Sequence, residues 1–477
     1  MDIRDLFLSC RKGDLERIKT LVEQRDVEVN QRDKWDSTPL YYACLCGHID
    51  VVRYLLQAGA RCDANTFDGE RCIYGALTSD IRSLLRRHKV ITSQTVRREL
   101  YHEFLRKLLD TGDYSDVRFV IHGRQYRAHR CILCARSTYF AEMFAGRWRS
   151  KTEVVINNAL VNPDAFGAVL SYLYTGQLET QVNQVDDVLR LAKQCKLITL
   201  QERLEEMANK AHFFQSTKPG THVTSVLVEA PPGSFELNSD LGSLADDAVP
   251  TALCGWVAGL ELPLMDVVNE ENKPQFVDVL FEVGGHRFAC HQAFFSGRSE
   301  FFRTLISDPL GELAGDVGSE IPVIPLRHFT PDIFTYILYY MYQDWVELEL
   351  NTVFEVLAAA ELCLLSGLKR LCGSFIAQHL DINCVFTVLR SSRMFAVPRL
   401  EDACYSFIAD NIEIVVDHPE FHDLIAEDAN SVADREETDS IDIIDQIRYQ
   451  LTADTIDDAH DRLELIDSLL DRLGYDG

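Results

Sequence analysis

Two stretches of the chain share one pattern of apolar and polar positions. In each, apolar side chains alternate with polar ones, which predicts a half-buried β-strand. The apolar members of these runs are Val117, Phe119 and Ile121 in the first stretch and Val279, Phe281 and Val283 in the second. A glycine turn and a second short run follow each time, which predicts a β-hairpin. The period then lengthens to three or four residues, so helices are expected to pack on each hairpin.

The two stretches are copies of one module. Polar and aromatic positions recur with a constant separation of 162 residues (116 to 278), without a gap. The recurring positions are Asp116, Gly123, His129, Arg136, Ser137 and Phe140 in the first copy, and Asp278, Gly285, His291, Arg298, Ser299 and Phe302 in the second. One supersecondary unit that occurs twice predicts two domains of the same fold.

Each copy resembles the BTB/POZ domain, whose pattern is D-V-x-F followed by A-H-[KR]-x-[IVL]-L-x-A-R-S-x-x-F. The first copy matches almost throughout, from Asp116 to Ser137. The second copy keeps the same framework but has Gln292 where the family has Lys or Arg. The resemblance implies BTB/POZ domains at residues 113–212 and 272–380.

The first 90 residues contain a shorter repeat. Residues 38–60 resemble the ankyrin repeat, T-P-L-H-x-A followed by G-H-x-x-V-V-x-x-L-L-x-x-G-A, with Tyr41 in place of the usual His. Gly13 precedes Gly47 by 34 residues, close to the ankyrin period of about 33, and a degraded unit begins at Asp68. Residues 1–90 are therefore expected to stack about three pairs of helices.

A finger before the central repeat carries Trp35 and Asp36, which we expect to contact a protein client. The alternative is that Trp35 only covers the neighbouring repeat. Residues 92–111 have apolar positions at a spacing of four and predict a connecting helix that starts at Ser93 or Thr95.

Residues 213–271 contain proline–glycine breakers around a strand-like run. They form either an insertion in the first BTB fold or a linker with added strands. Residues 381–426 are helical in pattern and resemble the start of the BACK region of cullin adaptors. Residues 427–440 are expected to be a mobile acidic linker. Residues 441–477 predict amphipathic helices, the last starting at a capping box at Thr455, whose apolar seam docks on the chain itself or on a partner.

Composition narrows the function classes. The hydrophobic fraction of 47% in 477 residues allows several packed cores. The net charge of −27 argues against a nucleic-acid partner, although the acidity is concentrated at the end, where residues 427–477 carry 16 acidic and 4 basic side chains. No apolar run approaches about 20 residues and no secretory signal opens the chain. We therefore expect a cytoplasmic protein with no membrane partner.

No catalytic motif stands out. The chain has no phosphate-binding loop, dinucleotide fingerprint, nucleophile elbow or zinc-protease helix. The fourteen cysteines are expected to be reduced core thiols, and Cys131-x-x-Cys134 lacks further ligands for a metal. His129 and His291 are expected to be satisfied core histidines. The sequence therefore predicts no catalytic residue, metal or cofactor.

The resemblance implies partners instead. BTB domains pair with themselves or bind cullin scaffolds, and the cullin contact uses an apolar-x-Glu motif after the third helix. Leu310 and Glu312 fit this motif in the second copy, whereas the loop 146–150 of the first copy has no Glu. In many BTB dimers a buried Asp and the cation after the conserved His form a charged pocket, which Asp116 and Arg130 reproduce.

Asp278 with Gln292 does not reproduce that pocket, which argues against standard homodimerisation through the second copy. The alternative for Asp116 is that it only anchors its own hairpin.

These patterns together predict a multidomain protein, mostly α with α+β modules: an ankyrin stack, two BTB/POZ domains and a BACK-like helical segment. The arrangement resembles the ankyrin repeat and BTB/POZ domain-containing protein family. The function it implies is a non-enzymatic adaptor of a cullin-3-type ubiquitin ligase, whose ankyrin repeats select the client. The alternatives are a scaffold or signalling regulator that only oligomerises through its BTB domains and, more remotely, a hydrolase or metal enzyme.

Overall fold

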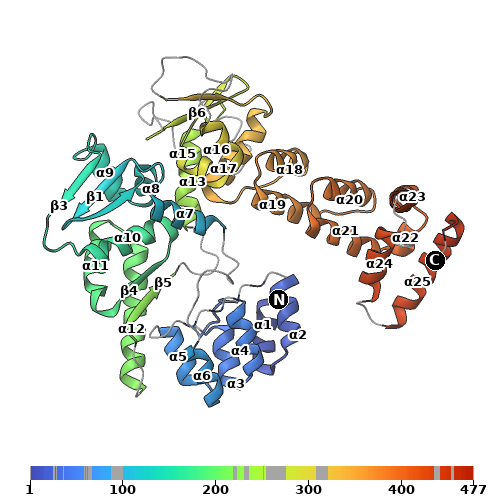
Figure 1. The fold of residues 1–477 in the computed structure, drawn as a ribbon, viewed down its shortest axis with the longest axis horizontal. Helices are drawn as coiled ribbons and strands as arrows, with labels where there is room; N and C mark the ends of the chain where they lie inside the picture. The colour runs from blue at the N-terminus through green and yellow to red at the C-terminus, as the bar shows by residue number, and fades with distance from the viewer. Residues whose placement is uncertain are drawn as a thin grey trace. The chain divides into compact units, whose positions relative to one another are not determined.

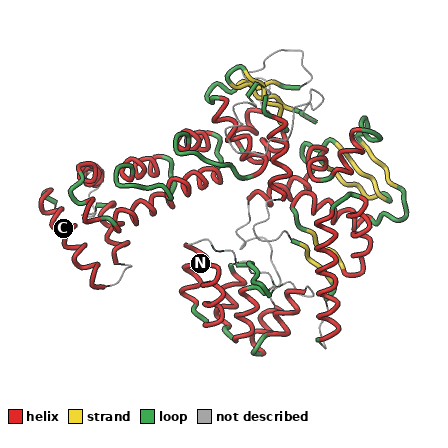
Figure 2. Tube along the Cα trace, turned by 180° about the vertical axis from the view of Figure 1, so that it is seen from behind, coloured by secondary structure: helices red, strands yellow, loops and turns green. Residues whose placement is uncertain are grey.

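A computed structural model describes residues 2–24, 29–35, 37–58, 67–87, 100–218, 223–229, 236–250, 276–307, 321–433, 441–452 and 456–475, with 27, 60, 62 and 252–253 between them. These residues divide into two compact units. One holds the described residues of 1–248, 260–278 and 291–293, and the other those of 249–259, 279–290 and 294–477. Helices dominate, with small three-stranded and two-stranded sheets, which confirms the predicted fold class (Figure 1, Figure 2).

The described residues of the ankyrin stack form helix pairs that lie side by side (Figure 1). The pairs are α1 (Asp2–Lys12) with α2 (Leu15–Lys19) and the π-turn η1 (Thr20–Gln24), α3 (Pro39–Cys46) with α4 (Ile49–Gln57), and α5 (Phe67–Gly75) with α6 (Ser79–Arg87). The first helices of successive pairs contact one another and share one apolar core.

Gly13 and Gly47 occupy the turn within successive pairs, at φ +79° and +84°. The positive φ favours glycine at both positions, and at Gly13 a Cβ would also lie 2.5 Å from the His48 ring of the next repeat.

The first BTB copy is built on a three-stranded sheet of order β2-β1-β3. Strand β1 (Val117–Ile121) pairs antiparallel with β2 (Arg124–Ala128) and parallel with β3 (Glu153–Ile156). The helices that accompany this sheet are α8 (Arg130–Arg136), α9 (Thr138–Ala145), α10 (Pro163–Thr175), α11 (Val185–Gln194) and α12 (Ile198–Thr217). Helix α7 (Leu100–Thr111) packs on α10; the predicted helix start at Ser93 or Thr95 lies outside the described residues.

The second copy repeats this topology as β7-β6-β8. Strand β6 (Val279–Val283) pairs with β7 (His286–Cys290), and Val279 is opposite Cys290 just as Val117 is opposite Ala128. The parallel strand is β8 (Val323–Pro325). The helices are α15 (Gln292–Arg298), α16 (Glu300–Ser307), α17 (Pro331–Gln343), α18 (Val353–Leu362) and α19 (Ser366–Ala377). The predicted duplication is therefore a duplication of fold.

The serine of the repeated motif has the same structural role in both copies. Ser137 Oγ donates to the carbonyl of Cys195 at 2.8 Å and accepts from the amide of Phe140, which caps α9. Ser299 Oγ donates to the carbonyl of Cys363 at 2.7 Å and caps α16 in the same way. In each copy this serine ties the start of one helix to the end of a distant one.

Residues after 213 complete the first BTB copy. Helix α12 continues to Thr217, five residues beyond the predicted end of the domain at 212. The strand-like run becomes β5 (Ser225–Val228), which pairs antiparallel with β4 (Leu178–Gln181). Helix α13 (Glu236–Ala248) packs on α8. The polar run 240–247 is thus helical, because its apolar face is buried: Leu237, Leu241, Leu244, Ala245 and Ala248.

The C-terminal part is helical, as its pattern predicts. Its elements are α20 (Val385–Met394), α21 (Pro398–Asp410), α22 (Ile412–Val415), α23 (Pro419–Ala433), α24 (Asp442–Thr452) and α25 (Ile456–Leu473). The expected mobile linker at 427–440 is wrong for its first part, because α23 runs to Ala433 and Asp428 is buried. Helix α25 packs on α24 and α22, so its seam docks on the chain itself; Thr455 lies outside the described residues.

Candidate protein-interaction surfaces

The finger of the ankyrin stack is organised by one carboxylate. Asp33 Oδ1 accepts from the amides of Trp35 at 2.9 Å and Ser37 at 3.0 Å, and Oδ2 accepts from the Tyr42 hydroxyl at 2.7 Å. Burial acts to raise the pKa of Asp33, but the hydrogen bonds from Tyr42, Ser37 and Trp35 outweigh it and the net pKa is lowered. Asp33 therefore ties the backbone at Trp35 and at Ser37 to its own side chain.

The Trp35 side chain projects from this fixed backbone with 59% of its surface exposed. Lys34 Nζ lies 4.2 Å from the centre of the indole ring. Arg71 stacks on Tyr41 and donates to Ser37 Oγ at 2.9 Å. Trp35 is thus an exposed aromatic side chain with cations nearby, and its contact with a protein client stays a prediction. Asp36, the other predicted contact, lies outside the described residues.

The structure brings Asp116 and Arg130 together, as the sequence predicts. Asp116 Oδ1 accepts from the backbone amide of Arg130 at 2.8 Å, and Oδ2 lies 3.9 Å from the guanidinium Nε. Burial raises the pKa of Asp116 although Arg130 opposes the shift. The aspartate therefore anchors the start of α8 and faces the cation at the same time, and a role of this pair in a dimer stays a prediction.

The second copy keeps the anchor without the cation. Asp278 Oδ1 accepts from the amide of Gln292 at 2.6 Å, and Gln292 Nε2 donates to the carbonyl of Asp278 at 2.8 Å. The pKa of Asp278 is raised to about 6, mainly by burial and in part by the negative charge of Asp116. The negative charge of Asp278 thus lacks the neighbouring cation that Arg130 provides for Asp116.

His129 and Cys131 of the first motif are core residues, and Cys134 is half-buried. The two ring nitrogens of buried His129 lie 2.7 Å from the Tyr174 hydroxyl and from the carbonyl of Asp113. Burial lowers the pKa of His129 and raises that of Cys131. His291 is buried at the same place in the second copy. Among the described residues, no three His, Cys, Asp or Glu side chains gather as metal ligands do.

The predicted cullin contact, Leu310 and Glu312, lies outside the described residues. The corresponding loop of the first copy is described, and its one large apolar side chain is unavailable. Trp148 is buried against Phe119, Phe140 and Phe144. That loop therefore presents no apolar anchor to a scaffold protein.

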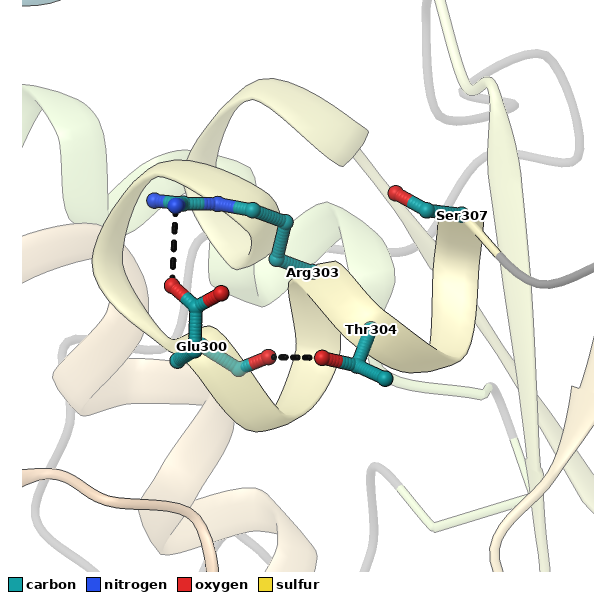
Figure 3. Close-up of a pocket in the computed structure, with 4 residues that line it drawn as sticks. All are labelled: Glu300, Arg303, Thr304 and Ser307. Atoms are coloured by element: carbon teal, nitrogen blue, oxygen red, sulfur yellow. Dashed lines mark hydrogen bonds and ion pairs between the residues drawn. The ribbon is translucent and has the colours of Figure 1, made fainter.

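A shallow hollow lies along α16, the helix before residues 308–320 (Figure 3). Two of the side chains that line it form an ion pair, Glu300 with Arg303 at 2.8 Å, and Thr304 Oγ1 donates to the backbone carbonyl of Glu300 at 2.9 Å. Since one helix face supplies the lining, this hollow has no converging groups for a reaction or a small ligand.

The sequence analysis did not predict several exposed apolar side chains of the second unit. Around the end of α17 and on α18 they are Trp345, Leu350, Phe354, Leu362 and Leu364, and further along the helices they are Met394 and Ile414. Trp345, Leu350 and Leu364 lie in the connections between helices, and the others lie on helices that are otherwise buried.

Within the described residues, no helix combines the length and the apolarity that crossing a membrane requires.

Comparison with known proteins agrees with this structure. The model of the BTB/POZ domain matches residues 105–212 and 268–380, and that of ankyrin repeats (3 copies) matches residues 6–68. BTB/POZ domain-containing protein 3 of Schizosaccharomyces pombe is 28% identical over 98% of this chain and 89% of its own length.

Two further relatives illustrate the range of similarity. Ankyrin repeat-containing protein YIL001W of Saccharomyces cerevisiae is 29% identical over 94% of this chain and 89% of its own length. Kelch-like protein 40 of Xenopus tropicalis is 31% identical over 20% of this chain and 15% of its own length. The chain therefore belongs with the ankyrin repeat and BTB/POZ domain-containing proteins, and it carries two BTB/POZ domains after its repeats.

Proposed function

We propose that this protein is a non-enzymatic substrate adaptor of a cullin-3-type ubiquitin ligase and that it works in the cytoplasm. Its ankyrin repeats bind the client, and its second BTB/POZ domain binds the cullin through Leu310 and Glu312. Ankyrin repeats and BTB/POZ domains are protein-interaction modules, so the chain is an interaction protein in any case. The cullin partner is the finer part of the proposal.

The observation that carries the client side is the Trp35 finger. Asp33 fixes its backbone and leaves the indole ring exposed. On the cullin side, the described loop of the first copy buries its tryptophan, which supports assigning the scaffold contact to the second copy. The helices α20 to α23 that follow support it too, since they resemble the BACK region of cullin adaptors.

The cullin side is tested by affinity purification from cells followed by detection of cullins. Wild type should retain a cullin, and the double variant Leu310→Ala with Glu312→Ala should lose it. The matched control is Arg147→Ala with Arg149→Ala, two exposed positions in the loop of the first copy. Cullin retained by the Leu310/Glu312 variant would move the contact elsewhere. No cullin with wild type would favour the scaffold function.

The client side is tested by proximity labelling with wild type and Trp35→Ala. Proteins labelled by wild type and lost with Trp35→Ala are the expected clients. The control is Phe213→Ala, since Phe213 is 69% exposed on α12, outside the repeats. An unchanged set of labelled proteins in Trp35→Ala would refute the role of the finger.

A further inference from the structure

The charged pocket of the first BTB copy is covered by its own chain. Phe276, just before the second copy, lies in the same compact unit as the whole first copy. Its ring centre is 6.0 Å from that of Phe144, in an edge-to-face arrangement, and 5.5 Å from the Arg130 guanidinium carbon. The guanidinium also lies 5.4 Å from the Phe144 ring, so Arg130 lies against both aromatic rings.

The side chain of Arg130 is correspondingly withdrawn from solvent. Only 13% of it is exposed, and its Nε is buried without a hydrogen bond. Its Nη2 donates to the carbonyl of Lys151 at 2.6 Å. A guanidinium in this state is not available to pair with a second molecule unless Phe276 moves.

Phe276 adopts φ +65°, a left-handed conformation that a bulky residue takes only when its surroundings impose it. Two residues later, the Asp278 carboxyl is close enough to Asp116 for the two charges to influence each other. His291 to Ala293, which include the amide that Asp278 caps, also belong to this unit. Residues 276–278 and 291–293 thus belong to the same unit as the Asp116–Arg130 pair.

We propose that the Asp116–Arg130 face of the first BTB copy is a docking face for the segment Phe276–Asp278 of the same polypeptide. That occupant closes the face, so the chain does not homodimerise through it. The family resemblance predicts a possible homodimer through Asp116 and Arg130. In this structure, residues 276–278 of the same chain occupy the face that a second subunit would contact.

The test is a photo-crosslink from position 276 in the full-length protein. Phe276→p-benzoylphenylalanine keeps an aromatic ring at the site and is prepared in light and in ¹⁵N-labelled form. The two forms are mixed, irradiated and digested, and the crosslinked peptides are identified by mass spectrometry. The expected products join position 276 to the peptides that contain Phe144 or Arg130, with both halves of each product carrying the same isotope.

Products that join a light half to a heavy half, seen as a covalent dimer of twice 54.3 kDa, would overturn the proposal. The absence of any product on Phe144 or Arg130 would overturn it too. The same label at exposed Phe213 is the matched control and should give neither product. This result is independent of whether a cullin binds, so the two proposals fail separately.

Discussion

Arg393 joins four helices of the second unit, and its removal is expected to loosen them. The residue lies on α20 and forms two bonds to Asp428 on α23, at 2.7 and 2.9 Å. It also donates to the Tyr405 hydroxyl on α21 at 3.0 Å. Asp428 Oδ2 in turn accepts from the amide of Ile443 at the start of α24, at 3.0 Å. The paired side chains are 25% and 12% exposed, so solvent replaces little of this network.

The magnitude follows from what Arg393→Ala leaves behind. Breaking a fully buried ion pair costs about 3–5 kcal/mol. Here the pair retains some exposure and Asp428 keeps the amide of Ile443, so we expect a loss of about 2–3 kcal/mol. At about 1.4 kcal/mol per tenfold change, the opening equilibrium of α23 and α24 should rise about 30- to 150-fold.

Amide hydrogen exchange measured by mass spectrometry reads this opening directly, peptide by peptide. Arg393→Ala should accelerate exchange by that factor in peptides from 419–433 and 441–452, and leave the ankyrin peptides unchanged. The matched control is Arg390→Ala, three residues earlier on the same helix. Arg390 also pairs with α23, through Glu427 at 3.0 Å, but the two side chains are 37% and 55% exposed.

An exposed pair contributes at most about 1 kcal/mol, so the Arg390→Ala variant should change exchange less than about fivefold. Equal effects of the two variants would refute the argument from burial. No acceleration with Arg393→Ala would refute the network itself.

Three further predictions concern the first unit. Asp278→Asn should be more stable than wild type at pH 7. The pKa of Asp278 in the folded protein is about 6, above the ordinary 3.8. Wild type therefore loses up to about 3 kcal/mol of its unfolding free energy as pH rises from 4 to 6. Melting temperatures of the two proteins should therefore converge at pH 4, and a gap that does not change with pH contradicts this. Asp240 on α13 forms an ion pair with Arg136 on α8. Asp240→Ala should therefore release α13 and allow protease to cleave at 236–248, whereas a wild-type cleavage pattern would show that the Arg136 contact is dispensable. Trp35→Ala should change the unfolding free energy by less than about 0.5 kcal/mol, since its ring is exposed; a larger loss in a thermal melt would make Trp35 a structural residue.

The shared architecture of the two BTB copies was predictable because the repeated residues act on nearby backbone. A serine that caps the next helix needs only its own position in the motif, as Ser137 and Ser299 show. The alternation in β1 and β6 fixes which strand face is buried, and the hairpin register follows. Local rules of this kind are visible in a single sequence.

Helix α13 was not predictable in the same way. Its apolar positions Leu237, Leu241 and Leu244 have helical spacing, but serine and aspartate residues between them make the segment polar overall. The decisive partner of Asp240 is Arg136, 104 residues earlier. Asp428 was misjudged for a similar reason, because its partner Arg393 lies 35 residues away. An acidic segment is predicted to be exposed to solvent unless the buried cation that pairs with it is known.

The carboxylate of Asp240 also explains why the two copies differ after their common motif. Arg136 and Arg298 are equivalent, and each is almost fully buried and donates to a backbone carbonyl of the helix that follows the sheet. In the second copy the carboxylate partner is Asp344, which ends α17 at φ 58°. In the first copy α10 ends at Gly176, which has the same left-handed backbone but no side chain.

Helix α13 supplies the missing carboxylate through Asp240. A buried guanidinium without an anion is strongly destabilising, so we expect the glycine at 176 to be compatible with a stable fold only when residues up to 248 are present. On this argument the first BTB copy folds as a longer unit than its motif indicates. A fragment that stops at residue 212 should expose the face of α8 that α13 covers, and it should aggregate. A fragment that continues to Ala248 should stay monodisperse in gel filtration. Equal behaviour of the two fragments would mean that solvent can replace Asp240.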